Sequence, residues 1–303
     1  MSTTKNNMQN PIPKPTIAFI GLGAMGMPML RHLIAAGYPA RVFARSPAAR
    51  ATAVAMGARL CDSPADAALG AGFVITNVTG TEDVRAVLLG AGGVIESAAH
   101  GTVCIDHSTI SAIATREMAL ALAAQGVLLL DAPVSGGAQG AIAGKLSIMA
   151  GGDASAFDAA LPLLQCYGKT IVHMGESGAG QVVKACNQLV QVVNIQGIAE
   201  AMLLARSQGV DTDKMLPCLA AGMASSKMLD LMGPKMSQGD FAAGIQARLH
   251  HKDFGLVSEL AVAAGLALPN VTATAAQLDK LMAAGLGFDD TSSLFSVLQN
   301  NSL

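Results

Sequence analysis

The sequence predicts an α/β protein in which a parallel sheet with covering helices precedes an all-α domain. Apolar runs typical of strands alternate with helical patterns up to about residue 175, and only helical patterns follow Gly178. Strands that alternate with helices in this way indicate a parallel sheet. Composition agrees, because 51% of the residues are hydrophobic, 33 are Gly and none is Trp, which suits helices packed closely on a sheet.

The first strand is expected at Ile17–Ile20, where a short apolar run is typical of a strand buried on both faces. Helices are expected over residues 27–36, 65–69, 83–89 and 111–125. The later strands are expected in the segments ARVFARS, GFVITNV, GTVCIDHST, GVLLLDAPV and TIVHMG.

Three parts are expected along the chain. Residues 1–14 are polar, contain proline and lack the apolar stretch of a signal peptide, so we expect a disordered tail. Residues 15–175 form the sheet domain and residues 176–303 the all-α domain. A long helix that begins near Gly178 joins the two domains, and the amides within this apolar segment favour a buried helix over a membrane span.

Charge and cysteine content narrow the class of protein. The net charge is −2 without a basic cluster, so nucleic acid is not an expected partner. Five scattered cysteines without a CxxC pair predict a reducing, cytoplasmic location. No metal site is expected, because His250, His251 and Asp253 have no matching second set of ligands.

A glycine turn follows the first strand and opens the first helix. Its residues are Gly21, Leu22, Gly23, Ala24, Met25 and Gly26. The GxGxxG spacing is strong in this context, because its glycines allow a tight turn, close approach of a pyrophosphate and close helix packing. We therefore predict a Rossmann-type domain that binds a dinucleotide, with the helix N-terminus facing the phosphates.

The end of the second strand predicts which dinucleotide binds. An NAD site normally offers Asp or Glu there, whereas this chain has Ala44, Arg45 and Ser46. An arginine and a hydroxyl suit a 2′-phosphate, so NADP is favoured. An arginine that is merely solvated, with either cofactor bound, is the alternative.

Polar residues also follow two later strands. Ser108 and Thr109 can contact a ligand at a strand end or cap a helix that begins near Ile110. Gly136 and Gly137 come directly after Ser135, and their exposed N–H groups can hold a carboxylate. A plain glycine turn is the alternative explanation of the second motif.

One face of the long helix is polar although most of its residues are apolar. Lys184, Asn187, Gln188 and Gln191 lie on this face, and Asn194 continues it by one turn. A lysine that reaches water from a core helix would explain this pattern. The other explanation is that these side chains form the floor of a cleft between the two domains.

Four motifs in order make the chain resemble the β-hydroxyacid dehydrogenase family over residues from about Thr16 to Leu298. They are FIGLGAMGMPM, DHSTIS, DAPVSGGAQGA and GAGQVVKACNQ, and LHHKDFGL is similar to a fifth element of the family. The family includes 3-hydroxyisobutyrate dehydrogenase and 2-hydroxy-3-oxopropionate (tartronate semialdehyde) reductase. The resemblance implies a Rossmann domain, a long helix, an all-α domain and a homodimer or homotetramer.

The resemblance also implies roles for individual residues. Lys184 would be the catalytic proton donor or acceptor, with Asn187 beside it on the substrate. The carboxylate of the substrate would bind Ser135, Gly136 and Gly137, with Ser108 nearby, and the cofactor would contact Asn77, Val78, Thr109 and Lys252. Two departures are evident: Asn77-Val78 replaces a usual Leu-Pro turn, and Gln188 stands where many members have a second Asn in the substrate site.

These features predict an NAD(P)-dependent oxidoreductase that interconverts a small 3-hydroxy acid and its semialdehyde. The Asn187-Gln188 pair resembles the tartronate semialdehyde reductases, so that NADPH-dependent reaction is the first expectation. The substrates 3-hydroxyisobutyrate and 4-hydroxybutyrate (succinate semialdehyde) are alternatives. Imine reductases share the fold but usually lack the lysine. A non-catalytic NADP-binding scaffold is an alternative from a different class of protein.

Overall fold

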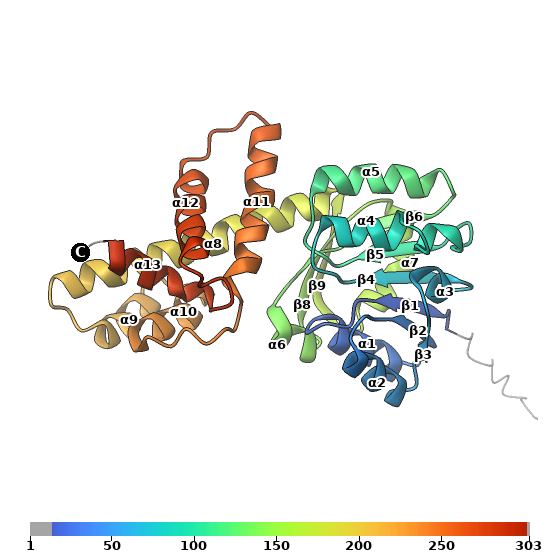
Figure 1. Ribbon diagram of the computed structural model, residues 1–303, viewed down its shortest axis with the longest axis horizontal. Coiled ribbons are helices and arrows are strands. Elements are labelled where there is room, and N and C mark those ends of the chain that lie inside the picture. The colour runs from blue at the N-terminus through green and yellow to red at the C-terminus, as the bar shows by residue number, and fades with distance from the viewer. Residues whose placement is uncertain (1–13, 302–303) are drawn as a thin grey trace, which may run out of the picture. The chain divides into compact units, whose positions relative to one another are not determined.

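The computed structural model describes residues 14–301, with side chains up to residue 300. The predicted disordered tail therefore lies outside the described residues, except for Lys14. Contacts divide the chain into two compact units (Figure 1). The sheet unit contains the described residues up to Thr109 together with residues 113–180, and the helical unit contains residues 110–112 and those from Gln181 onward.

The sheet unit is built on one sheet of nine strands. The strands are β1 (Ile17–Ile20), β2 (Ala40–Phe43), β3 (Arg59–Leu60), β4 (Phe73–Thr76), β5 (Val103–Asp106), β6 (Leu128–Asp131), β7 (Val134–Ser135), β8 (Leu146–Gly151) and β9 (Gly168–Gly175). Their order is β3-β2-β1-β4-β5-β6-β8-β7, with β9 paired to β8. The order reverses between β1 and β4, which is where open parallel sheets bind ligands at their carboxyl ends.

The sheet is mostly parallel, as predicted, and includes antiparallel pairs at one edge. Strands β1 to β6 pair in parallel, but β8 pairs antiparallel to both β6 and β7. The short strands β3 and β7 were not predicted, and neither was β8. Mixed sheets are common among large sheets, where an antiparallel edge strand is added to an otherwise parallel sheet.

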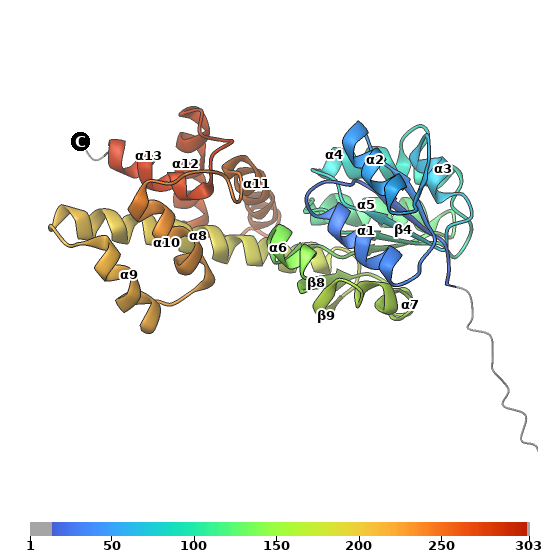
Figure 2. The same ribbon diagram turned by 90° about the horizontal axis from the view of Figure 1, so that it is seen from below.

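Seven helices of the described residues accompany the sheet (Figures 1 and 2). They are α1 (Gly26–Ala35), α2 (Pro47–Ala55), α3 (Pro64–Ala68), α4 (Thr81–Leu89), α5 (Ala112–Ala123), α6 (Gly137–Ile142) and α7 (Ala154–Leu164). Phe19 and Ile75 from the strands and Leu30 and Leu33 from α1 are fully buried in one core. Removal of this apolar surface from water is the main stabilising contribution.

The helical unit is built around α8 (Ala179–Ser207), the long helix that was predicted to begin near Gly178. The other helices are α9 (Thr212–Ala221), α10 (Lys227–Gln238), α11 (Ala247–Ala263), α12 (Pro269–Ala283) and α13 (Leu294–Asn301). Val192, Ile195 and Met202 of α8 are buried against Phe254 of α11 and residues of the other helices. The apolar face of α8 thus forms a second core.

Length and composition alone would allow α8 to cross a membrane, since it has 29 residues and a mean hydropathy of 1.2 in its most apolar window. A core helix can meet the same criteria. Lys184, Gln188 and Gln196 are buried polar residues within this helix. Because polar groups are costly in hydrocarbon, these residues favour the core-helix interpretation.

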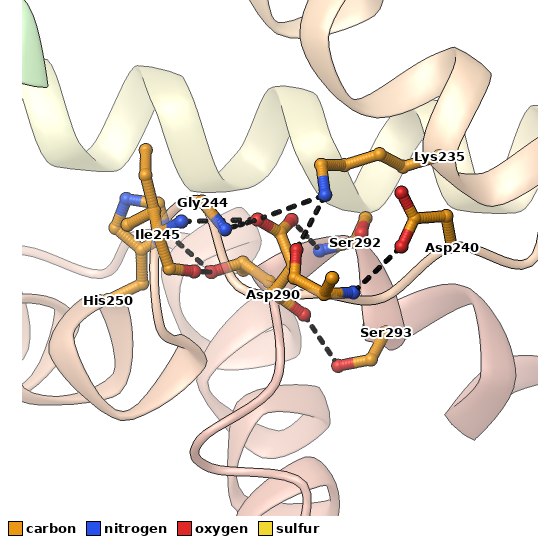
Figure 3. A network of polar contacts seen from close by, with 10 residues as sticks. Lys235, Asp240, Gly244, Ile245, His250, Asp290, Ser292 and Ser293 are labelled. Atoms are coloured by element: carbon orange, nitrogen blue, oxygen red, sulfur yellow. Dashed lines mark hydrogen bonds and ion pairs between the residues drawn. The ribbon is translucent and has the colours of Figure 1, made fainter. Parts of the chain in front are cut away.

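A buried carboxylate organises the segment that leads into α11 (Figure 3). Asp290 Oδ2 accepts from the N–H groups of Gly244 and Ile245 at 2.8 and 3.1 Å, while Oδ1 accepts from Ser292 N–H at 3.0 Å. The ammonium of Lys235 lies 3.8 Å from Oδ2. The carboxylate therefore joins α10, the segment before α11 and the segment before α13.

Candidate active site

The glycine turn after β1 has the geometry that its spacing predicted. Gly21 has a φ of +95°, and a Cβ there would lie 2.1 Å from the carbonyl oxygen of Asn77. A Cβ on Gly26 would lie 2.1 Å from the oxygen of Gly21, whereas one on Gly23 would meet no atom within 4 Å. The first and third glycines are thus needed for the turn itself, and the second leaves open space where a phosphate can approach.

Helix α1 begins directly after this turn without a capping side chain. Its first residue is preceded by Met25, and no side chain of the described residues bonds to the N-terminal N–H groups. In contrast, α2, α3 and α7 are capped by Ser46, Ser63 and Asp153. Uncapped N–H groups and the helix dipole suit an anion, so the turn and α1 together fit the pyrophosphate of a dinucleotide.

The residues after β2 are arranged to accept further negative charge. Ala44 is buried, and the side chain of Arg45 is 80% exposed with a long contact of 3.9 Å to Asp83. The Ser46 hydroxyl accepts from Ala49 N–H at 3.4 Å and caps α2. Arg45 is therefore able to bind a phosphate, because its present ion pair is long and solvated.

A buried hydrogen-bond cluster joins the carboxyl ends of β4 and β5. The hydroxyls of Thr76 and Ser108 each donate to Asp106 Oδ1 at 2.7 Å. The Ser108 hydroxyl also accepts from the N–H of Val78 at 2.9 Å. Ser108 is 2% exposed, so its hydroxyl supports the loop that carries Asn77 and Val78, and its predicted contact with substrate stays a prediction.

The helix after β5 begins later than predicted. Its first residue is Ala112 rather than one near Ile110. Within the helical unit, the N–H of Ile110 donates to the side-chain oxygen of Gln181 at 3.1 Å. This hydrogen bond was not predicted. The role of Thr109 at the cofactor stays a prediction.

The glycine pair after β6 lies in a tight turn between β7 and α6. Gly136 and Gly137 have φ values of +131° and +62°, which strain other residues. Ser135 is the last residue of β7, and α6 begins at Gly137 without a side-chain cap in the described chain. The turn thus follows β6 at the carboxyl edge of the parallel strands, and the binding of a carboxylate there stays a prediction.

Lys184 is a buried cation on α8. It is 7% exposed, and burial lowers the pKa of its ammonium to about 8. The nearby carboxylate of Asp253 acts in the opposite direction and raises this pKa, while the charge of Lys252 lowers it further. An ammonium with a pKa near neutrality can give up its proton and take it back at working pH.

The amides beside Lys184 form a chain of hydrogen bonds from α8 to α11. Asn187 Nδ2 donates to Gln188 Oε1 at 2.7 Å, and Gln188 Nε2 donates to Asp253 Oδ2 at 2.7 Å. The ammonium of Lys252 lies 2.9 Å from the other oxygen of Asp253. The structure therefore brings Asn187, Gln188 and Lys252 together, with Asp253 as the link between them. The predicted roles of these residues at substrate and cofactor stay predictions.

The polar residues of α8 have different partners along the helix. Asn194 lies further along the helix, and its Oδ1 accepts from the hydroxyl of Ser226, the residue that caps α10. Asn194 thus holds α10 against α8 and belongs to the packing of the helical unit. Only the part of the face near Lys184 joins the network with α11.

Sequence reasoning missed two buried carboxylates that organise these groups. Asp106 ends β5 and Asp253 follows Lys252, so each was quoted within a motif but assigned no role. A carboxylate at the end of a buried strand and one adjacent to a lysine were the available signals. Among the described residues, no group of three or more His, Cys, Asp or Glu side chains is arranged to hold a metal.

Two sequence families match consecutive parts of the chain. Residues 16–175 match the family described as the NAD binding domain of 6-phosphogluconate dehydrogenase. Residues 178–298 match the family described as NAD-binding of NADP-dependent 3-hydroxyisobutyrate dehydrogenase. These ranges meet beside Gly175, the expected domain boundary, while contacts divide the units at Gly180.

Individual relatives cover most of the chain. Identity to 2-hydroxy-3-oxopropionate reductase of Escherichia coli is 37%, over 93% of this chain and 97% of the relative. Identity to 3-hydroxyisobutyrate dehydrogenase of Pseudomonas aeruginosa is 38%, over 79% of this chain and 83% of the relative. The solved structure of Mycobacterium tuberculosis 3-hydroxyisobutyrate dehydrogenase with L-serine has a TM-score of 0.86 and 34% identity, covering 94% of this chain and 99% of that one.

The glycine turn on a Rossmann-type sheet and the buried lysine on a long helix define a nicotinamide-dependent oxidoreductase that acts on hydroxy acids. The chain belongs to the β-hydroxyacid dehydrogenase family, in which 3-hydroxyisobutyrate dehydrogenases are found. The predicted family, fold class and enzyme class are confirmed. The predicted cytoplasmic location stays a prediction.

Proposed function

We propose that this protein is an NADPH-dependent reductase of a small semialdehyde acid, with tartronate semialdehyde as the first candidate substrate. The observation that carries this proposal is the buried Lys184, whose pKa of about 8 leaves its ammonium mostly protonated at pH 7. The identity to 2-hydroxy-3-oxopropionate reductase of E. coli supports the substrate class.

The reaction requires a hydride and a proton. The reduced nicotinamide, when bound, supplies the hydride to the carbonyl carbon. Lys184 gives its proton to the carbonyl oxygen as the negative charge develops there, and Asn187 orients that oxygen. In the direction of oxidation, neutral Lys184 takes the proton from the hydroxyl group.

The preference for NADPH rests on the residues after β2. Ala44 stands where an NAD site usually has a carboxylate. Arg45 has an exposed guanidinium, and its ion-pair partner Asp83 is distant. Arg45→Ala should weaken NADPH binding about 10- to 100-fold, the effect of losing a charge-assisted bond, and leave NADH binding nearly unchanged. Asp83→Asn is the matched variant, and it should strengthen NADPH binding by releasing Arg45. Equal losses for both cofactors in Arg45→Ala would contradict the preference.

An exposed apolar stripe on α8 supports a homodimer or homotetramer. Cys186, Val190, Gly197 and Leu204 are exposed and recur on one side of the helix, where the exposed Glu200 is the charged member. Val190 and Leu204 are 66% and 67% exposed in the single chain. Light scattering of wild type and Leu204→Glu should show an oligomer that the charge weakens; a monomeric wild type would disprove this proposal.

The reaction itself is tested with a panel of tartronate, succinate, methylmalonate and related semialdehydes, with NADPH and NADH, on wild type and Lys184→Ala. We expect NADPH oxidation with tartronate semialdehyde and a loss of about 100- to 10,000-fold in the variant, because a general acid contributes roughly 10²–10⁴-fold. NADPH binding should be unchanged in Lys184→Ala. Equal turnover of the two proteins would remove Lys184 from the mechanism, and NADPH binding without turnover would favour the scaffold alternative.

A further inference from the structure

We propose that Gln188 is a positioning residue that fixes the orientation of the Asn187 side-chain amide through the carboxylate of Asp253. This inference rests on the proposed function for its kinetic consequence. The geometry that supports it lies wholly within the helical unit. Gln188 accepts one hydrogen bond from Asn187 on the same helix, α8, and donates another to Asp253 on α11.

The direction of these hydrogen bonds follows from the chemistry of the three groups. The Asp253 carboxylate only accepts hydrogen bonds, so Gln188 must present its NH₂ group to it. The carbonyl oxygen of Gln188 then faces Asn187 and requires a donor there. Asn187 must therefore turn its NH₂ group toward Gln188, as observed at 2.7 Å. A single carboxylate thus sets the orientation of two successive amides.

Burial makes this orientation strongly favoured. Gln188 is 4% exposed and Asp253 is 8% exposed, so water competes weakly for their polar atoms. The ammonium of Lys252 lies 2.9 Å from Asp253 Oδ1 and holds the carboxylate on its other side. If Asn187 were flipped, two acceptor oxygens would face each other, which is costly for buried groups.

The orientation of Asn187 determines what it can offer to a ligand. One of its N–H bonds is committed to Gln188, while its Oδ1 and its second N–H point elsewhere. A 3-hydroxy acid can donate its hydroxyl hydrogen to Oδ1, and the corresponding semialdehyde can accept from the second N–H. Both partners of the reaction are therefore accommodated without a flip of the amide.

The length of Gln188 is part of this arrangement. Asparagine is one methylene shorter, by about 1.5 Å, so it cannot reach both Asn187 and Asp253 with hydrogen bonds of normal length. The charged or titratable groups of α11 that affect Lys184 or respond to it are His250, Lys252 and Asp253. Of these, Asp253 accepts a hydrogen bond from Gln188.

The first test observes the amides directly. Side-chain ¹⁵N amide spectra would be recorded for wild type, Gln188→Met and Asp253→Leu, with Asn187→Ala used to assign the Asn187 signal. We expect a shifted, slowly exchanging Asn187 N–H in wild type that exchanges at least about 10-fold faster in Gln188→Met. Asp253→Leu removes both acceptor oxygens and should give the same loss, which covers the case in which Gln188→Met does not fold. An unchanged Asn187 signal in these variants would overturn the proposal, whatever the substrate is.

The second test is a double-mutant cycle on tartronate semialdehyde reduction. Gln188→Met should lower kcat/KM roughly 10- to 100-fold, as expected for a misplaced catalytic group. In the Asn187→Ala background it should have almost no further effect, because Gln188 acts through Asn187. A purely structural role would give equal losses in both backgrounds and would overturn the proposal.

Gln196→Met is the matched control for both tests. Gln196 is another buried glutamine of α8, two turns further on, and its Nε2 donates to the carboxylate of Glu200 at 2.8 Å. Its replacement should leave the Asn187 signal and kcat/KM unchanged. If tartronate semialdehyde is not turned over at all, the proposed function fails, and the amide spectra alone decide the role of Gln188.

Discussion

The hydroxyl of Thr76 donates to Asp106 Oδ1 at 2.7 Å, so a side-chain bond joins the last residues of two neighbouring parallel strands. Ser108 adds two more donors to the same oxygen. Asp106 Oδ2 has no hydrogen-bond partner among the described residues. Burial raises the pKa of this carboxyl from 3.8 to about 6, despite the opposing effect of the hydrogen bonds.

The raised pKa predicts a pH-dependent effect of Asp106→Asn on stability. The folded protein binds this proton more tightly than the unfolded chain does, so the stabilisation is complete below pH 3.8 and is lost as the pH rises through about 6. Asparagine keeps Oδ1 and does not titrate. Relative to wild type, the variant should gain roughly 3 kcal/mol in free energy of unfolding between pH 4 and pH 8.

Urea unfolding at several pH values measures this difference. Asp153→Asn is the control, because hydrogen bonds lower the pKa of Asp153 and its pH dependence should have the opposite sign. A constant difference between Asp106→Asn and wild type would show that Asp106 does not titrate in this range.

Lys184 predicts the pH dependence of the reaction. Reduction requires the ammonium, so kcat/KM for the semialdehyde should be constant below a pH of about 8 and fall about tenfold per pH unit above it. Oxidation of the hydroxy acid requires the neutral amine and should rise to a plateau over the same range. The side chain in Lys184→Arg stays protonated throughout. The remaining reductase activity of this variant should therefore lack the fall in kcat/KM above about pH 8, the basic limb of the pH profile. A basic limb that persists in this variant would assign it to another group.

Substitutions of two glycines in the same turn should have different effects, one on the stability of the fold and the other on the binding of NADPH. Gly21→Ala should destabilise the fold by several kcal/mol, because a φ of +95° and a contact of 2.1 Å with Asn77 both oppose a side chain. Gly23→Ala has open space for its methyl group, so the fold should persist while NADPH binding weakens at least about tenfold. Thermal unfolding and fluorescence titration with NADPH separate the two effects. Tight NADPH binding by Gly23→Ala would move the pyrophosphate away from this turn.

The hydrogen bonds of Asp290 should stabilise the segment before α11. In Asp290→Ala the N–H groups of Gly244, Ile245 and Ser292 lose their acceptor (Figure 3). The free energy of unfolding should fall by about 2 kcal/mol or more, with faster proteolysis at residues 240–246. Asp240→Ala is the matched control, because exposed Asp240 accepts only from Ala242 N–H. Equal proteolysis of the two variants would show that Asp290 does not hold this segment.

Local patterns account for the part of the fold that was predicted correctly. The run Ile17–Ile20 followed by GxGxxG specifies a buried strand, a tight turn and a helix within a few residues of chain. The spacing of Lys184, Asn187 and Gln188 places them on one face of a helix because the α-helix has a fixed period. Strands β7 and β8 escaped prediction because a short apolar run in a glycine-rich segment has no distinct period.

The amino-acid sequence was sufficient to predict the order of most elements, the glycine turn after β1 and the lysine with its neighbouring amides on one helix. Each depends on residues that are close in the chain, where backbone geometry limits the outcome. Three further features depend on tertiary packing: the antiparallel direction of β8, the hydrogen bond of Thr76 to Asp106, and the hydrogen bond of Gln188 to Asp253, which lies 65 residues later in the chain. Burial of these polar side chains requires partners, and which partners they find depends on how helices and strands distant in sequence pack together.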